Sequence, residues 1–162
     1  MGKLKDIATF AYGKMPKEKS KGNIPVFSGY GIVGYCTTPL YSKLHIVVIA
    51  RGDSGSGRIV RSPQQFYLTN LAIAILLNDE VYRDFIYYYL SSQDTSTLRT
   101  GSAQAQVTIN SLEEFEILIP VKEVCRSFYQ VIDTFEKQRI LLSKENNVLV
   151  RTKDLLLLKL SH

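Results

Sequence analysis

The sequence predicts an α+β protein, with a mixed-sheet domain over residues 1–120 followed by one long helix over residues 121–162. Before Pro120, short apolar segments alternate with Gly, Ser, Pro and Asn, which is typical of strands joined by turns. After Pro120 there is neither Gly nor Pro, and an apolar residue recurs every seventh position. A hydrophobic content of 45% in 162 residues allows a core and excludes a disordered chain.

Seven segments before Pro120 have the length and the β-branched or aromatic content of strands. The continuous apolar run from His45 to Ala50 suits a strand that is buried on both faces. The predicted strands are Ile24–Phe27, Ile32–Cys36, Leu44–Ala50, Ile59–Val60, Phe66–Thr69, Ala72–Leu77 and Phe115–Ile119.

Two helical segments are predicted inside this domain. Asn78 is a candidate N-cap, Asp79 and Glu80 favour a first turn, and apolar residues follow at helical spacing over 81–90. Farther on, Ser111 and Glu114 have the spacing of a capping box and predict a short helical turn before the last strand.

The C-terminal segment carries a sustained seven-residue apolar repeat. Such a repeat predicts a helix that packs along its length against another helix. About forty residues at ~1.5 Å each form a rod of roughly 60 Å, too long for the preceding domain to cover. A partner helix from a second copy or another protein is expected; the alternative is a helix folded back on its own domain. The predicted pairing residues are Phe128, Phe135, Leu142, Leu149 and Leu156.

Charge is unevenly distributed along the chain. Residues 1–61 hold ten Lys or Arg against three Asp or Glu, whereas residues 62–120 hold two against seven. A basic first third indicates a positive surface that faces a polyanion such as nucleic acid, although solvated lysines on an ordinary surface remain the alternative. Cys36 and Cys125 are far apart in the sequence and lack the close spacing of a cysteine pair. The charged start Met1–Lys5 predicts no signal peptide. We therefore expect a cytoplasmic location.

The segment Arg51-Gly-Asp-Ser-Gly-Ser-Gly-Arg58 follows the buried strand and has four interpretations. A phosphate-binding P-loop would need Lys and Ser or Thr where Arg58 and Ile59 stand, and a helix where a strand is predicted. A serine nucleophile at Ser54 would need a histidine, and His45 on the preceding strand is too close in sequence to turn back. An adhesive Arg-Gly-Asp tripeptide would need an extracellular setting.

The fourth interpretation is a glycine-rich hairpin that approaches a DNA backbone, with Arg51, Arg58 and Arg61 at its base. A tight surface hairpin without function remains the alternative. Two other loops invite similar interpretations. Gln104 and Gln106 have the amides that read adenine in the major groove, or they are solvated loop residues. Tyr30, between two glycines, either faces a ligand or packs inward.

The sequence contains no recognisable catalytic or metal-binding pattern. No His/Cys cluster occurs, and the acidic pairs at 79–80 and 113–114 are explained by helix starts. Neither the glycine-rich cofactor loop nor the Asn-Pro-Pro-aromatic strip of a DNA methyltransferase is present. We therefore expect a protein that is not an enzyme and that needs no cofactor or metal of its own.

Taken in order, these segments resemble one half of a type I restriction–modification specificity subunit. The similarity runs from the first residue to the last, and its strength lies in the order and spacing of its parts. The helix start departs from the family pattern, because Val124-Cys-Arg126 stands where the family has Glu-Gln. The matching segments are Lys3–Ala8 with Tyr12–Lys14, Ile24–Tyr35, Val48–Gly57, Thr69-Asn70, Gly101–Gln104, Leu118–Pro120 and Leu155–Leu160.

The resemblance carries expectations about assembly. A complete subunit of that family has two recognition domains and two helices, and this chain has one of each. It implies that two copies pair through their helices as an antiparallel coiled coil, and that this homodimer reads a bipartite inverted-repeat site. It further implies partner methyltransferase subunits, which bring adenine methylation and S-adenosylmethionine, together with a possible restriction subunit.

The predicted function is therefore sequence-specific recognition of double-stranded DNA. Two alternatives stay open: a small DNA-modifying enzyme, nuclease or methyltransferase, with a degenerate site, and a coiled-coil adaptor for protein assembly. The residues predicted to contact DNA are Lys14, Lys17, Tyr30, Arg51, Ser54, Ser56, Arg58, Arg61, Thr69, Gln104 and Gln106.

Overall fold

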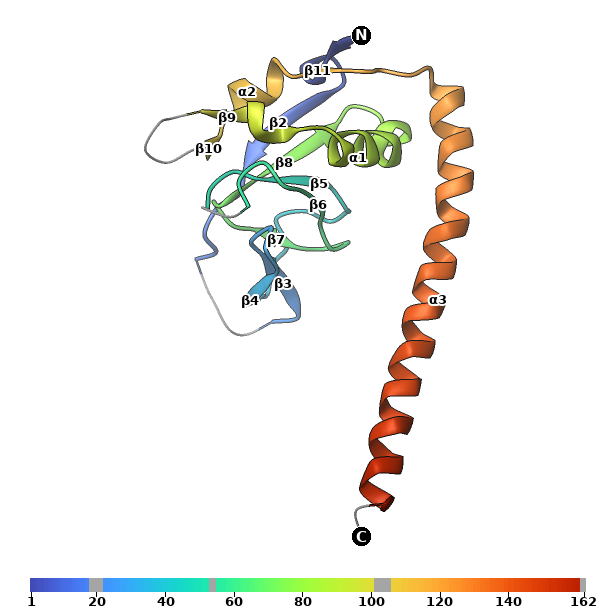
Figure 1. Ribbon diagram of the computed structural model, residues 1–162. Helices are drawn as coiled ribbons and strands as arrows, with labels where there is room; N and C mark the ends of the chain where they lie inside the picture. The colour runs from blue at the N-terminus through green and yellow to red at the C-terminus, as the bar shows by residue number, and fades with distance from the viewer. Residues whose placement is uncertain (18–21, 53–54, 101–105, 161–162) are drawn as a thin grey trace.

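The computed structural model describes residues 1–17, 22–52, 55–100 and 106–160, the last two of these by backbone alone. A layered domain carries one long helix, which runs beside it and then beyond it (Figure 1). The elements are β1 (Gly2–Lys3), η1 (Leu4–Asp6), β2 (Ala8–Tyr12), β3 (Ile24–Phe27), β4 (Ile32–Cys36), β5 (Ile46–Ile49), β6 (Ile59–Arg61), β7 (Tyr67–Leu68), β8 (Ala72–Leu77), η2 (Glu80–Tyr82), α1 (Arg83–Ser92), η3 (Thr95–Leu98), β9 (Arg99–Thr100), β10 (Gln106–Val107), α2 (Ile109–Glu113), β11 (Glu116–Ile117) and α3 (Lys122–Leu160).

The central sheet has the order β2-β8-β5-β6, and all of its strands are antiparallel. Every residue of β5 is buried, as its continuous apolar run predicts. A second sheet has the order β4-β3-β7, in which β3 pairs with β7 in parallel and with β4 in antiparallel orientation. The α+β class with a mixed sheet is confirmed.

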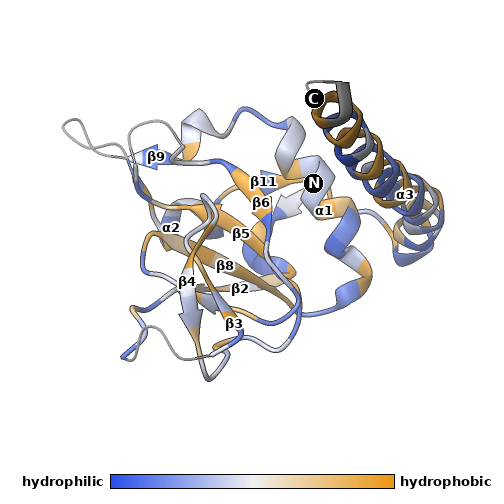
Figure 2. Ribbon diagram, turned by 90° about the horizontal axis from the view of Figure 1, so that it is seen from below, coloured by the Kyte–Doolittle hydropathy of each residue, from blue (hydrophilic) through white to orange (hydrophobic). Residues whose placement is uncertain are grey.

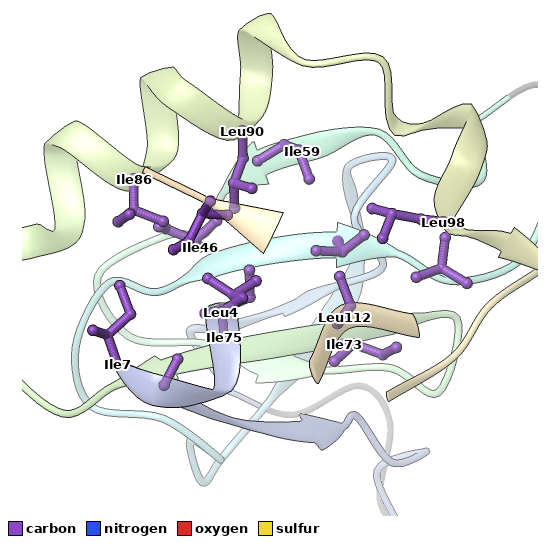
Figure 3. Close-up of a cluster of buried hydrophobic side chains, with 14 of the residues drawn as sticks. Leu4, Ile7, Ile46, Ile59, Ile73, Ile75, Ile86, Leu90, Leu98 and Leu112 are labelled. Atoms are coloured by element: carbon purple, nitrogen blue, oxygen red, sulfur yellow. The ribbon is translucent and has the colours of Figure 1, made fainter. Parts of the chain in front are cut away.

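The main core lies between the central sheet and the helical segments that cover one of its faces. Ile46 and Ile75 from the sheet meet Leu90 of α1, while Leu4 and Leu112 close the cluster from η1 and α2 (Figure 3). A second cluster, built around Phe66 and Leu68, fills the space on the other face of β5. Burial of these side chains is the main source of stability for the domain.

Strand predictions hold best where the apolar pattern is strong. β8 has the predicted bounds, whereas the predicted strand Leu44–Ala50 shortens to the four residues of β5. β2 was not predicted, because Ala8–Tyr12 alternates weakly and depends on its pairing with β8 along one edge. The short strands β1, β9 and β10 were missed for the same reason, since each depends on a distant partner or a hairpin.

Both predicted helix caps are wrong by one to three residues. Asp79, not Asn78, caps the first helical segment, because its carboxylate accepts a hydrogen bond from the Val81 amide at 3.0 Å. Farther along, Thr108 caps α2 and Ser111 is its reciprocal partner in the capping box. The glutamate at 114 instead binds Lys3 and Lys5 on the N-terminal segment.

The long helix is confirmed as α3, and the domain covers only its first part. Cys125 is buried, and Phe128 lies 5.5 Å from Phe85 and 5.8 Å from Tyr88 between ring centroids. Every residue from Lys137 to Leu158 is exposed. Orange and blue residues alternate along the helix, which shows its amphipathic character (Figure 2). Among the described residues, no helix combines the length and the apolar character needed to span a membrane.

Candidate nucleic-acid interface

Four segments meet at one end of the central sheet, where β5 ends. The Ala50 and Arg51 amides both donate to the Leu71 carbonyl, which joins the glycine-rich loop to the turn before β8. The Val107 amide donates to the Ala50 carbonyl at 2.9 Å and brings the β9–β10 hairpin to the same place. The Lys14 amide donates to the Leu68 carbonyl at 2.8 Å, which brings the segment after β2 to the same place. In Figure 1, β9 and β10 lie on the side of the domain turned away from α3.

Two glycines shape the loop that follows β5. Gly52 and Gly57 have φ values of 126° and 89°, in the region that residues with a Cβ rarely adopt. The Gly57 amide donates to the Ile49 carbonyl at 2.8 Å and directs the chain back into β6. The loop therefore closes a hairpin between two strands, as the DNA-backbone interpretation and the structural alternative both require.

Tyr30 lies across this loop. Its hydroxyl donates a hydrogen bond to the Arg51 carbonyl at 3.1 Å. A Cβ added to Gly52 would lie 2.0 Å from the Tyr30 hydroxyl oxygen, and one added to Gly55 would lie 2.6 Å from the ring. The side chain is 44% exposed. Tyr30 thus braces the loop while nearly half of its surface stays exposed.

Several predicted contact residues are accessible to solvent. Lys14, Lys17, Arg51, Arg58 and Gln106 are all exposed. Lys17 also lines a groove of about 340 Å³ beside β4 and β7. Ser54 and Gln104, which the sequence singled out, lie outside the described residues.

Two predicted contact residues point inward. Ser56 is 3% exposed and donates its hydroxyl to the Ala50 carbonyl at 3.2 Å, so it stabilises the loop from within. Thr69 is also 3% exposed, and its hydroxyl has no hydrogen-bond partner in the described part of the chain. Neither hydroxyl is presented to a ligand in this conformation, because both side chains are buried.

Arg61 lies at the opposite end of the sheet from Arg51 and Arg58. It pairs with Ile46 at the start of β5, whereas the glycine-rich loop follows the end of that strand. Its side chain is 22% exposed and bonded to Asp84 and Glu136. The sequence-based expectation placed Arg61 at the base of the hairpin. In a strand, however, side chains two residues apart lie on the same face of the sheet. Arg61 therefore shares with Ile59 the face that packs on α1.

The basic side chains of residues 1–120 divide into two groups. Lys3, Lys5, Lys43, Arg61 and Arg83 each form an ion pair. Among the described residues of that range, the Lys and Arg side chains without an ion-pair partner are Lys14, Lys17, Arg51, Arg58 and Arg99. Lys14, Arg51, Arg58 and Arg99 belong to the segments just described, whereas Lys17 lines the groove beside β4 and β7. Four of the five cations therefore lie around the end of β5.

Sequence reasoning missed Arg99. This exposed residue of β9 faces Val107 across the β9–β10 hairpin and so belongs beside the end of β5. Its only signal in the sequence is its place just before the loop that contains Gln104. A short two-residue strand gives no periodicity from which the pairing could be inferred.

Comparison with known proteins now decides the family. The family model described as type I restriction modification DNA specificity domain matches residues 1–151. The chain belongs to this family. A curated relative of this specificity domain, the type I restriction enzyme EcoprrI specificity subunit of Escherichia coli, is 25% identical over 112 residues, 69% of this chain and 28% of that protein.

Solved structures show the same fold for the specificity domain. The S subunit of a type I restriction-modification system from M. genitalium matches with a TM-score of 0.69 and 22% identity, covering 84% of this chain and 38% of that chain. The HsdS subunit from Thermoanaerobacter tengcongensis matches with a TM-score of 0.58 and 16% identity, covering 85% of this chain and 37% of that chain. The present chain therefore spans little more than a third of these relatives.

The geometry of the specificity domain disagrees with a serine nucleophile and with a P-loop in the glycine-rich loop. His45 lies before β5 and the loop lies after it, so the length of the strand separates the histidine from the loop. The loop leads into β6 and not into a helix, which disagrees with a P-loop. Within the described residues, no cluster of three His, Cys, Asp or Glu side chains suits a metal ion.

Proposed function

We propose that this chain recognises a specific sequence in double-stranded DNA as the non-catalytic specificity subunit of a type I restriction–modification system. The observation that carries the proposal is the group of unpaired cations around the end of β5. Lys and Arg side chains free of ion pairs are available to phosphate oxygens, while exposed Gln106 and Arg99 are available to base edges.

The two parts of the chain would divide this work. Residues 1–120 would form the DNA-reading domain, and residues 121–162 would form the spacer and pairing helix. The interface loops and α3 lie on different sides of the domain (Figure 1), so DNA and a helical partner could be bound together without competing for one surface.

Pairing with a second copy accounts for the exposed apolar face of α3. The exposed fractions of Phe135, Leu142, Leu149 and Leu156 are 59%, 58%, 66% and 55%. A continuous apolar stripe of this length is unfavourable in water and favours a helical partner. In an antiparallel homodimer the two domains would lie at opposite ends and read the halves of an inverted repeat.

The catalytic functions would come from other subunits. Methyltransferase subunits, with their S-adenosylmethionine, and a restriction subunit would assemble on the dimer, and the complex would act on DNA in the cytoplasm. Membership of the specificity family supports this assignment. One structure with the same fold, covering 86% of this chain, is described in terms of complex assembly and conformational transition of the type I system.

The test compares Arg58→Ala with Lys43→Ala in duplex DNA binding across a salt titration. Lys43 is an exposed cation that pairs with Glu80 and precedes β5, away from the loops. We expect Arg58→Ala to weaken binding and to reduce the slope of log affinity against log salt by about 0.9 if one phosphate contact is lost. Lys43→Ala should match the unmodified protein, and neither variant should change the melting temperature.

Three outcomes would contradict the proposal. One is an absence of duplex binding at low salt, which would favour a protein-assembly role. Another is equal binding by both variants. The third is cleavage or methylation of DNA by the purified chain alone, which would make it an enzyme.

A further inference from the structure

Arg61 joins three elements of the fold at one point. Its Nη2 donates to Asp84 Oδ1 of α1 at 2.9 Å, and its Nη1 donates to Glu136 Oε1 of α3 at 3.3 Å. The guanidinium carbon lies 4.1 Å from the ring centroid of Tyr87 and 5.0 Å from that of Tyr88. This cluster of Arg61, Asp84, Tyr87, Tyr88 and Glu136 is here called the helix latch.

The latch is specific to an arginine. The Tyr88 hydroxyl donates to the same Glu136 oxygen at 2.9 Å, so that oxygen receives two donors. The charged side chains are only 22%, 14% and 25% exposed for Arg61, Asp84 and Glu136. A planar guanidinium can lie flat on a ring while two separate nitrogens donate to two carboxylates, a geometry that the single nitrogen of a lysine ammonium does not reproduce. Loss of one partner from such a cluster leaves the other charge poorly solvated.

The latch lies far enough along α3 from Phe128 to help fix the direction of the helix. Phe128 packs on α1, and Glu136 lies eight residues further along, about 12 Å at ~1.5 Å per residue. Glu136 is also the last partly buried side chain in the described part of the helix, because residues 137–158 are exposed. The domain thus holds α3 at two separated points, which together define its direction.

The remaining helix is long compared with the distance between these two points. From Glu136 to Leu160 the helix extends about 36 Å. Phe128 lies about 48 Å from that end, so a swing of about 10° around Phe128 would move it by about 8 Å, between two and three base-pair steps of ~3.4 Å. The angle at the latch therefore has consequences on the scale of DNA spacing.

We propose that Arg61 is a positioning residue that fixes the angle between the recognition domain and α3, and thereby the spacer length between the two half-sites of the DNA target. This inference rests on the proposed function, because spacing has meaning only for two domains joined through their helices. Strand β6 links the DNA-facing loop to the helix latch, since Arg58 of the interface precedes the strand and Arg61 ends it.

The first experiment measures spacing preference. Duplexes carrying inverted half-sites at a series of spacer lengths are bound by the full chain, by Glu136→Gln and Arg61→Lys, and by the control Glu123→Gln. The control removes an exposed ion pair with Arg126 on the same helix. We expect one sharply preferred spacer for the unmodified chain and the control. In both latch variants the ratio of affinities between the preferred spacer and the other spacers should fall several-fold, while the affinity for a single half-site should stay the same.

The second experiment measures the angle without DNA. Spin labels at exposed Ser91 of α1 and Arg151 of α3, diluted with unlabelled chain, report the distance between domain and helix. Cys36 and Cys125 are buried and should label poorly. We expect Glu136→Gln to broaden the distance distribution and Glu123→Gln to leave it unchanged. A folded Glu136→Gln protein with an unchanged distribution or an unchanged spacer preference would overturn the role of the latch. Lack of DNA binding by the unmodified chain would overturn the proposed function, whereas the distance measurement would still decide whether the latch holds the helix.

Discussion

At the scale of single residues, the contact between Tyr30 and the glycine-rich loop depends on the absence of side chains at two positions. Gly55 needs no left-handed backbone, so a substitution there acts only through the 2.6 Å clash with the Tyr30 ring. Gly31 is its natural control, because a Cβ there would meet nothing within 4 Å. Comparing alanine substitutions at Gly55 and Gly31 therefore separates a steric clash with Tyr30 from the general effect of adding a methyl group.

We expect Gly55→Ala to displace the Tyr30 ring, break its hydrogen bond to Arg51 and weaken duplex DNA binding several-fold. Gly31→Ala should bind as the unmodified protein does. Binding isotherms at one fixed salt concentration give the comparison, since affinity for DNA changes steeply with salt. Equal affinities for the two variants would show that the brace has no part in recognition.

Glu114 provides a second residue-scale prediction. Hydrogen bonds from Lys3 and Lys5 lower the pKa of Glu114 from 4.5 to about 2. A carboxyl group with a lowered pKa in the folded state stabilises the fold above its unfolded pKa, and the contribution is lost as pH falls from about 4.5 toward 2. Glu114→Gln should therefore show a smaller loss of stability over that range, measured as urea midpoints at pH 6 and pH 3.

Glu116→Gln is the matched control, because Glu116 is exposed on the neighbouring strand β11. The effect at Glu114 should shrink in high salt, since its own side chain and both lysines are about half exposed. The same acid dependence for both variants would mean that the lysines do not stabilise the folded state through Glu114.

At the scale of elements, the five heptad residues of α3 have two different tasks. Phe128 packs on α1 of its own domain, whereas the other four are exposed along the helix. The expectation treated all five as one pairing surface, because a seven-residue repeat does not reveal what lies against each turn. Ring contacts to Phe85 and Tyr88 now assign the first of them to the domain–helix junction.

Substitutions should separate these two tasks. We expect Leu142→Glu and Leu149→Glu to convert a dimer to a monomer in light scattering, because a charge would be buried in the helical seam. Lys144→Glu, about 200° around the helix from Leu142, should leave the dimer intact. Phe128→Ala should instead lower the unfolding free energy by on the order of 2 kcal/mol. A dimer that survives both leucine changes would contradict pairing through α3.

At the scale of the whole molecule, the proposed two-fold dimer predicts the form of the DNA target. Selection from random duplexes should return inverted repeats with one spacer length, since both copies carry the same reading surface. DNA with a single half-site should bind much more weakly, because the second contact of a joined pair is effectively intramolecular. Recovery of a single, non-repeated sequence would contradict a homodimer and favour a different partner for the helix.

Local sequence signals were enough to predict the class of the protein, the buried strand β5, the long helix and the glycine-rich loop that follows β5. These follow from local signals: an apolar run, a seven-residue repeat, and glycines at tight turns. The order of segments in the sequence was also enough to suggest the family that the comparison established.

Which side chains of those segments face outward depends on contacts between distant parts of the fold. Arg58 and Arg61 are three residues apart and look equivalent in sequence, yet one is exposed at the loops and the other is held in the helix latch. Ser56 and Phe128 were redirected in the same way, toward the domain interior and toward α1. The physical reason is that side-chain direction depends on strand register and on partners distant in the chain, and neither leaves a local pattern.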